Sequence, residues 1–227
     1  MLYNYSMQKN FVFSLKQSKI DKFKYCCSQI FLFLCVICFT FIIYTNVTYS
    51  IAPVSGLSMY PTLNASENYN GLSHYDKVVL NYIKMYKKGD IIVAKKIGEH
   101  TEKYVIKRLI ALGGDRLEIK SDGSVYVNDV KLDEKYVTSD RKVDTYNSFI
   151  NYKNTNPKID GVEIFDENVL IIPKGYVYYL GDNRGASYDC SNYGPVKENN
   201  IVAKIDYIIK DGENEFLSIL RQFFGGK

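Results

Sequence analysis

The chain has 227 residues, of which 46% are hydrophobic and 24% charged, enough for one sizeable domain and an appendage. Tyrosine, phenylalanine and β-branched residues are plentiful, which favours strands over helices, so we expect a mainly β fold with one core. The formal net charge of +4 is modest and comes partly from one patch near the N-terminus. It gives no argument for a nucleic-acid partner.

The first 50 residues have the pattern of a membrane anchor. Residues 1–24 hold five lysines against one aspartate, and residues 25–49 hold no charged residue. About 20 apolar residues cross a bilayer as a helix, and loops rich in lysine stay in the cytoplasm. The sequence therefore predicts a cytoplasmic basic tail at 1–24, a single transmembrane anchor at 25–49 and an extracytoplasmic domain at 50–210. This places the protein in the cell membrane with its N-terminus inside.

A cleaved secretory signal is the alternative reading of this segment. Ser50–Ala52 resembles a small-x-small cleavage site. Pro53 would then directly follow the cut, and the apolar run is long for the central region of a signal. Both features favour an uncleaved anchor.

The cysteines predict neither a disulfide framework nor a metal site. Cys190 is alone in the external part of the chain, and no cluster of histidine or cysteine accompanies it. We therefore expect no metal and no cofactor. The other four cysteines fall in or beside the anchor: Cys26, Cys27, Cys35 and Cys38.

The external chain reads as a series of strands. Residues 78–94 alternate short apolar runs with a turn, a β-branched run ends at Gly113 and Gly114, and Asp122-Gly123 marks a hairpin. Residues 138–168 are polar and weakly periodic, and we expect them to form a long surface insert between strands. Residues 201–209 predict a last strand.

Residues 211–227 predict a short amphipathic helix that packs on the domain or rests at a membrane interface. It is too short to span a bilayer. Its apolar residues recur at helical spacing: Phe216, Leu217, Leu220, Phe223 and Phe224.

Ser58 stands between Leu57 and Met59, an unusual setting for a plain loop hydroxyl. A serine nucleophile needs a base, usually histidine, but His74 and His100 both lie in polar stretches, so a Ser-His-Asp triad has little support. Lys107 is the other candidate base. A lysine titrates near pH 10.4 in water, and burial beside a second cation would lower that pKa. A strand lysine more often points to solvent.

Three short motifs occur in order behind the anchor: SMYPTL at Ser58–Leu63, KRLIALGGD at Lys107–Asp115 and GDNRGASYD at Gly181–Asp189. A fourth, GDIIVA at Gly89–Ala94, lies between the first and the second. Together they resemble the bacterial type I signal peptidases, Ser/Lys proteases of the extracytoplasmic membrane face. The resemblance runs from about residue 50 to residue 205. It implies a signal-peptidase-like β-rich catalytic domain.

The resemblance also implies roles for individual residues. Ser58 corresponds to the nucleophile, with its backbone N–H donating to the oxyanion, and Lys107 to the general base. Ser187 matches the position whose hydroxyl orients the lysine. Some members have a serine as second oxyanion donor two residues before the nucleophile, where this chain has Gly56.

Three further residues match structural positions of the family, and a fourth is a candidate replacement. Asp182 and Arg108 correspond to a buried ion pair that fixes the third motif beside the base strand. After Asp189 the family usually reads Ser-Arg, whereas this chain has Cys190-Ser191. Arg184 is then the nearest replacement partner for Asp189.

By the same resemblance the substrates are exported precursor proteins, cut after a small-x-small (Ala-x-Ala) motif. The peptide would bind as an added strand alongside residues 53–58 and 104–107. Ser58 follows the anchor closely, so an extended chain keeps it within roughly 35 Å of the lipid bilayer. The oligomeric state is left open. The residues expected to narrow the pockets are Val54, Met59, Leu63, Val105 and Ile106.

Two rival functions remain at this stage. A soluble regulator that cuts itself with Ser/Lys chemistry would need no lipid anchor, and residues 25–49 count against it. A membrane-anchored β-domain without catalytic activity, binding peptides or envelope partners, is the other alternative. The departure at Cys190-Ser191 is the sequence feature that leaves this second alternative open.

Overall fold

The structure is a computed structural model that describes residues 2–66, 74–83, 85–95, 103–137 and 142–224, with side chains from residue 21 to residue 221. The chain divides into two compact units, Met1–Thr48 and Tyr49–Lys227. The helices are α1 (Leu2–Thr48), α2 (Lys142–Thr155), α3 (Cys190–Tyr193) and α4 (Glu215–Phe224). The strands are β1 (Tyr49–Pro53), β2 (Lys77–Asn81), β3 (Ile91–Lys95), β4 (Tyr104–Leu112), β5 (Arg116–Ile119), β6 (Val125–Val127), β7 (Val130–Lys131), β8 (Lys158–Ile159), β9 (Val162–Glu163), β10 (Phe165–Asp166), β11 (Val169–Ile171), β12 (Tyr176–Leu180), β13 (Val196–Lys197) and β14 (Ile201–Ile209).

Helix α1 makes up the first unit. Its segment Asp21–Thr48 contains an 18-residue window with a mean hydropathy of 2.6 and is long and apolar enough to cross a membrane. The hydroxyl of Thr45 and the amide of Asn46 both donate to the carbonyl of Ile42, at 3.0 and 2.8 Å. These polar side chains therefore find partners within the helix, as a lipid environment requires.

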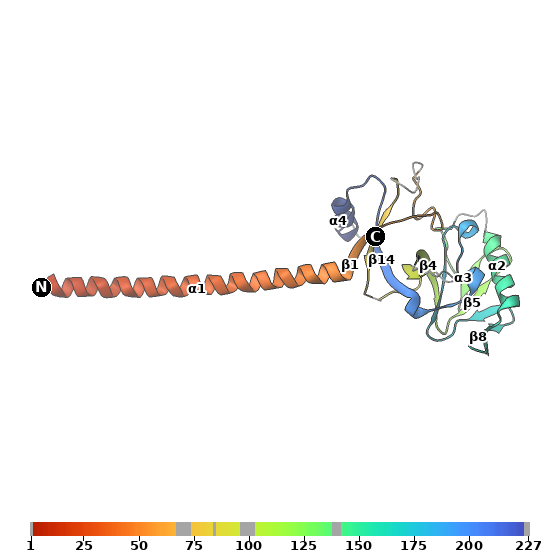
Figure 1. The fold of residues 1–227 in the computed structure, drawn as a ribbon, viewed down its shortest axis with the longest axis horizontal. Coiled ribbons are helices and arrows are strands. Elements are labelled where there is room, and N and C mark those ends of the chain that lie inside the picture. The colour runs from red at the N-terminus through yellow and green to blue at the C-terminus, as the bar shows by residue number, and fades with distance from the viewer. Residues whose placement is uncertain (1, 67–73, 84, 96–102, 138–141, 225–227) are drawn as a thin grey trace. The chain divides into compact units, whose positions relative to one another are not determined.

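The larger sheet of the second unit has seven strands in the order β1-β2-β14-β3-β4-β12-β13. Figure 1 labels β1, β14 and β4 of this sheet. Strand β14, the last of the chain, lies between β2 and β3, which are neighbours in sequence. All strand pairs in this seven-stranded sheet are antiparallel. Strand β1 is at one edge, and β4 pairs with β12 only through Arg108–Leu112.

A second sheet has five strands in the order β10-β11-β5-β6-β7. Strands β5 and β6 form the hairpin predicted at Asp122-Gly123, and Gly123 has a positive φ of 78°, a conformation that favours glycine. The mainly β fold expected from the composition is confirmed.

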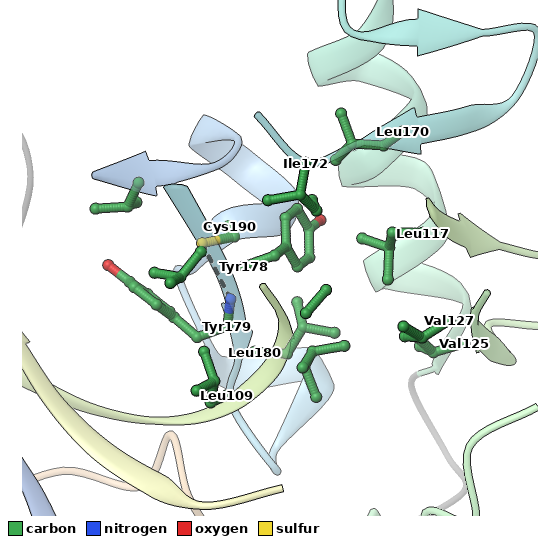
Figure 2. Close-up of a cluster of buried hydrophobic side chains, with 14 of the residues drawn as sticks. Leu109, Leu117, Val125, Val127, Leu170, Ile172, Tyr178, Tyr179, Leu180 and Cys190 are labelled. Atoms are coloured by element: carbon green, nitrogen blue, oxygen red, sulfur yellow. Dashed lines mark hydrogen bonds between the residues drawn. The ribbon is translucent and has the colours of Figure 1, made fainter. Parts of the chain in front are cut away.

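The main core lies between the two sheets. Figure 2 shows Leu109 of β4 and Tyr178–Leu180 of β12 on one side, with Leu117, Val125 and Val127 of the five-stranded sheet facing them. Tyr178, Tyr179 and Leu180 are fully buried. The strand that leads into the third motif is therefore anchored in the main hydrophobic core of the domain.

The expectation of a purely surface insert at 138–168 is wrong for residues 142–155. These residues form α2, and its side chains Thr145, Phe149 and Tyr152 are buried. Phe149 is fully buried and packs edge-on against Phe165, with ring centroids 5.6 Å apart. The helical spacing of these few apolar residues is masked in the sequence by the asparagines and lysines on the other faces. Residues 138–141 lie outside the described part of the chain.

The C-terminal helix α4 follows β14 after a short turn. Phe216 and Leu217 on it are exposed, whereas Ser218 is buried. Its first residue, Glu215, accepts a hydrogen bond from Lys77 Nζ at 2.7 Å. This contact ties the start of α4 to strand β2.

We predict that Phe149→Ala destabilises the domain by about 3–5 kcal/mol, because it removes a large buried ring and leaves a cavity between α2 and the sheet. Val143→Ala, an exposed position of the same helix, is the matched control and should leave the unfolding midpoint nearly unchanged. Denaturant unfolding followed by circular dichroism measures both. Equal midpoints for the two variants would contradict a core role for α2.

Candidate active site

Ser58 lies in a turn segment that follows β1, and its side chain is half-buried. The backbone of this segment is held by Asn183, whose N–H donates to the carbonyl of Ser58 and whose Nδ2 donates to the carbonyl of Leu57, both at 3.0 Å. In a trans peptide the C=O and N–H point in opposite directions. Asn183 therefore orients the N–H of Ser58 away from itself.

Lys107 is in the middle of β4, opposite Ile92 of β3, and is only 2% exposed. The strand lysine therefore does not point to solvent. Its Nζ donates a hydrogen bond of 2.8 Å to the hydroxyl of Ser187. The Lys107 side chain is held inside the domain by a residue 80 positions further along the chain.

Ser187 connects Lys107 to the buried carboxylate of Asp189. The Ser187 hydroxyl donates to Asp189 Oδ2 at 2.5 Å, and the same oxygen accepts the N–H of Gly181 at 2.8 Å. Asp189 Oδ1 accepts the N–H and the hydroxyl of Ser191, at 3.1 and 2.9 Å. Four donors thus surround a carboxylate that is 2% exposed, which satisfies it despite its burial.

Gly181 lies against both the side chain of Ser187 and the backbone of Ser58. A Cβ atom at this position would lie 2.2 Å from the Ser187 hydroxyl oxygen and 2.5 Å from the carbonyl oxygen of Ser58. Both distances are far too short for any side chain. The close approach of the Ser58 backbone to the Lys107–Ser187 pair therefore depends on glycine here.

The expected contact between Arg108 and Asp182 is present. Arg108 Nε and Nη2 donate to the two oxygens of the fully buried Asp182 at 2.8 and 2.6 Å, and Thr62 donates to the same carboxylate at 2.5 Å. Burial works to lower the pKa of Arg108, but the hydrogen bonds and charge of Asp182 outweigh it and the pKa is raised. The guanidinium also lies 3.9 Å from the ring centroid of Tyr136.

Arg184 does not pair with Asp189, contrary to the expectation from the sequence. Its Nη2 forms a buried ion pair with Glu134, and its Nε donates to the carbonyl of Gly181 at 3.0 Å. Ser191, which stands where the family has arginine, supplies two of the donors to Asp189 instead. Neutral donors can replace the guanidinium because Asp189 also caps the start of α3.

Cys190 lies next to this network and is fully buried. Its sulfur accepts the N–H of Tyr179 at 3.3 Å, the dashed line in Figure 2. Burial raises the pKa of the Cys190 thiol well above its ordinary value. The thiol therefore stays protonated and acts as a small packing group, not as a nucleophile.

A cleft with a volume of about 470 Å³ opens beside Ser58. Residues from five neighbouring strands, β1, β2, β14, β3 and β4, line it, so the sheet curves around the cleft. The lining is largely apolar. It consists of Ala52, Pro53, Val54, Ser55, Gly56, Ser58, Met59, Val78, Leu80, Tyr82, Val93, Tyr104, Val105, Ile106 and Val202.

Four of the five residues expected to shape the pockets line this cleft: Val54, Met59, Val105 and Ile106. The fifth, Leu63, is 1% exposed and packs in the core cluster beneath, together with Val54 and Met59. Leu63 therefore supports the cleft floor instead of facing the cleft. Leu80 and Val202 also line it and were missed, because they are single residues on strands that become neighbours only in the sheet, and so was Tyr82, which directly follows β2. Tyr104, from the expected strand 104–107, lines it as well.

The histidines do not enter this site in the described part of the chain. His74 Nδ1 is 3.1 Å from Asp211 Oδ2, and His100 lies outside the described residues. No group of three histidine, cysteine, aspartate or glutamate side chains among the described residues could hold a metal ion. Among the described residues, the basic group that contacts Ser187 is Lys107.

Comparison with known proteins gives a consistent family match. A family model described as "Signal peptidase, peptidase S26" matches residues 27–210. A signal peptidase I of Bacillus caldolyticus is 35% identical over 158 residues, 68% of this chain and 75% of its own length. A signal peptidase I of Bacillus amyloliquefaciens is 31% identical, covering 68% of this chain and 70% of its own length. A solved signal peptidase I from Enterococcus faecalis is 25% identical and covers 54% of this chain and 97% of its own, with a TM-score of 0.36.

The Cys190 thiol predicts a change of stability at alkaline pH. Its folded pKa is raised above the ordinary value of 9.0, so the folded state holds the proton more tightly than the unfolded chain. The resulting stability is fully present below about pH 9 and is lost as the pH rises further, by up to about 1.4 kcal/mol per pH unit. Cys190→Ser removes this dependence.

We therefore expect the melting temperature of the wild type to fall more steeply than that of Cys190→Ser between about pH 9 and 10, since the tyrosines, which begin to ionise there, are the same in both chains. Thermal melts in detergent measure the slopes. Cys38→Ser in α1 is the control and should keep the wild-type slope. Identical slopes for the wild type and Cys190→Ser would contradict the prediction.

Proposed function

The chain belongs to the signal peptidase family, peptidase S26, and from the geometry of its site we propose that Ser58 and Lys107 are the catalytic pair. The family resemblance drawn from the four motifs is thereby confirmed. The protein is a serine protease that removes signal peptides by hydrolysing a peptide bond. The assignments of individual residues, the bond cleaved and the membrane orientation are our proposals.

The observation that supports the catalytic pair is the hydrogen-bond chain from Lys107 through Ser187 to Asp189. Lys107 in its neutral form takes the proton of the Ser58 hydroxyl, and the Ser58 oxygen attacks the carbonyl carbon of the scissile bond. The oxyanion accepts the N–H of Ser58, which Asn183 orients. The Lys107 ammonium then gives its proton to the leaving amine, and an acyl-enzyme remains.

A water molecule completes the cycle. Neutral Lys107 takes a proton from this water, and the hydroxide attacks the acyl carbon. The ester bond to Ser58 breaks, the Lys107 proton returns to the Ser58 oxygen, and the signal peptide leaves with a new carboxyl terminus. An intact Lys107–Ser187–Asp189 chain counts against a domain that has lost catalysis and only binds peptides.

Two open strand edges support binding of an extended peptide. Strand β1 is at the edge of its sheet. The first half of β4, Tyr104–Lys107, does not pair with β12. Residues of both strands line the cleft at Ser58. A precursor could therefore add as a strand in this cleft, with backbone hydrogen bonds giving affinity and the apolar lining selecting small side chains of an Ala-x-Ala motif.

We propose that α1 anchors the enzyme in the cell membrane, with its basic N-terminus in the cytoplasm and the catalytic unit outside, and that the bilayer and exported precursors are its partners. The alternative of cleavage after Ala52 is disfavoured by β1. Its residues Tyr49–Pro53 pair with β2 along their whole length, and Ala52 and Pro53 line the cleft. Such a cut would remove most of this strand from the sheet.

The test is a processing assay on membranes that carry the enzyme and a precursor whose signal ends in Ala-x-Ala. We expect the wild type to release the mature protein, and Ser58→Ala and Lys107→Ala to be slower by at least about 10³-fold, because each removes an essential proton-transfer partner. Lys131→Ala, an exposed lysine of the second sheet, is the matched control and should keep full activity. Processing by Ser58→Ala and Lys107→Ala at the wild-type rate would contradict the proposal.

The pH dependence of kcat tests the role of Lys107 separately. A lysine acts as a general base only when it is neutral, so activity should rise with pH as the ammonium loses its proton. The depressed lysine pKa expected from the sequence stays a prediction. Single-turnover rates from pH 6 to pH 9 measure it, and a flat profile would count against Lys107 as the base.

A further inference from the structure

Both ends of the loop that carries Ser58 are hydrogen-bonded to one buried residue, Asp76. The N–H of Val54 donates to the backbone carbonyl of Asp76 at 2.9 Å, and the N–H of Asn64 donates to its side-chain Oδ2 at 2.8 Å. Asp76 is 1% exposed and directly precedes β2. The residues between these two contacts, 54–64, therefore form a closed loop with Ser58 near its middle.

Asn64 fastens the same loop from within. It is 2% exposed, and its Nδ2 donates to the carbonyls of Val54 and Gly56 at 2.9 and 3.0 Å, while its Oδ1 accepts the N–H of Asp76 at 2.8 Å. Its φ is +56°, a conformation that asparagine tolerates better than most residues. One amide thus makes three hydrogen bonds in a position that suits its backbone.

The Asp76 carboxylate links this loop to the end of β14. Lys210 Nζ lies 2.9 Å from Asp76 Oδ2 and donates to the carbonyl of Thr62 at 2.8 Å, and the N–H of Asp211 donates to Asp76 Oδ1 at 3.0 Å. With the bond from Asn64, the carboxylate accepts three donors. The positive charge of Lys210 offsets part of the free-energy cost of burying the Asp76 carboxylate.

We propose that Asn64 and Asp76 are positioning residues for Ser58, an inference that rests on the proposed role of Ser58 as nucleophile. Asn64 holds the carbonyl of Gly56 and Asn183 holds the carbonyl of Leu57, so two consecutive peptide planes before Ser58 are fixed from two sides. The second of these planes carries the Ser58 N–H, the donor to the oxyanion. Asn64 and Asp76 contact neither substrate nor reacting atoms and act through the shape of the loop.

The test separates this role from a merely structural one by resolving kcat from KM. In Asn64→Gly the backbone keeps its access to a positive φ but loses the amide, and Asp76→Asn keeps the shape but removes the charge that faces Lys210. We expect each variant to lower kcat by about 10–100-fold with KM within about threefold, because small displacements of reacting groups reduce the chemical step steeply.

The assay uses the full chain in detergent, a peptide that contains Ala-x-Ala, and measurement well below the melting temperature of every variant. Val127→Ala, a buried change in the five-stranded sheet, is the control for lost stability and should keep the wild-type kcat. Unchanged kcat in Asn64→Gly and Asp76→Asn, or a rise in KM alone, would overturn the inference.

Ser58→Ala in the same series identifies a failure of the underlying proposal. If Ser58→Ala cleaves as fast as the wild type, the nucleophile assignment is wrong, and the positioning role is overturned with it. If Ser58→Ala is inactive while both loop variants match the wild type, only the positioning role is overturned.

Discussion

The hydrogen bond between Lys107 and Ser187 is the contact on which the proposed chemistry depends. A buried lysine is costly unless its Nζ has partners, and it can serve a serine only if it is held at one position. Strand β4 gives the Lys107 Nζ its partner, because it places Lys107 between β3 and the third motif. The single position depends on Gly181, because any side chain there would separate Ser187 from the Ser58 backbone.

Two buried ion pairs hold the third motif in place around this contact. Arg108 and Thr62 fix Asp182, and Glu134 holds Arg184. Such pairs contribute little net stability when compared with apolar packing, but leaving one charge without its partner is strongly destabilising. They therefore act mainly by making other arrangements of residues 181–189 unfavourable, which restricts Ser187 to one position.

The sequence predicted the parts of the site that lie in short linear motifs, and the structure brings those parts together. It predicted the strands around residues 78–94 and 201–209, but not that β14 separates β2 from β3, because local periodicity carries no information about strand order. The pairing of Arg184 with Glu134 was missed for the same reason, since 50 residues separate them. Asn64 and Asp76 were missed because a single polar residue in a loop looks solvated until its burial is known.

The directions of the hydrogen bonds around Ser187 can be worked out from Asp189 outward. Two backbone N–H groups, of Gly181 and Ser191, donate to the side chain of Asp189, and the Ser187 hydroxyl is its neighbour at 2.5 Å. The single proton of the Ser187 hydroxyl therefore points at Asp189, and the Ser187 oxygen must accept from Lys107. An amine that donates to Ser187 does not use its lone pair there. In the proposed reaction this lone pair takes the proton of Ser58, so Asp189, acting through Ser187, sets the direction in which Lys107 donates.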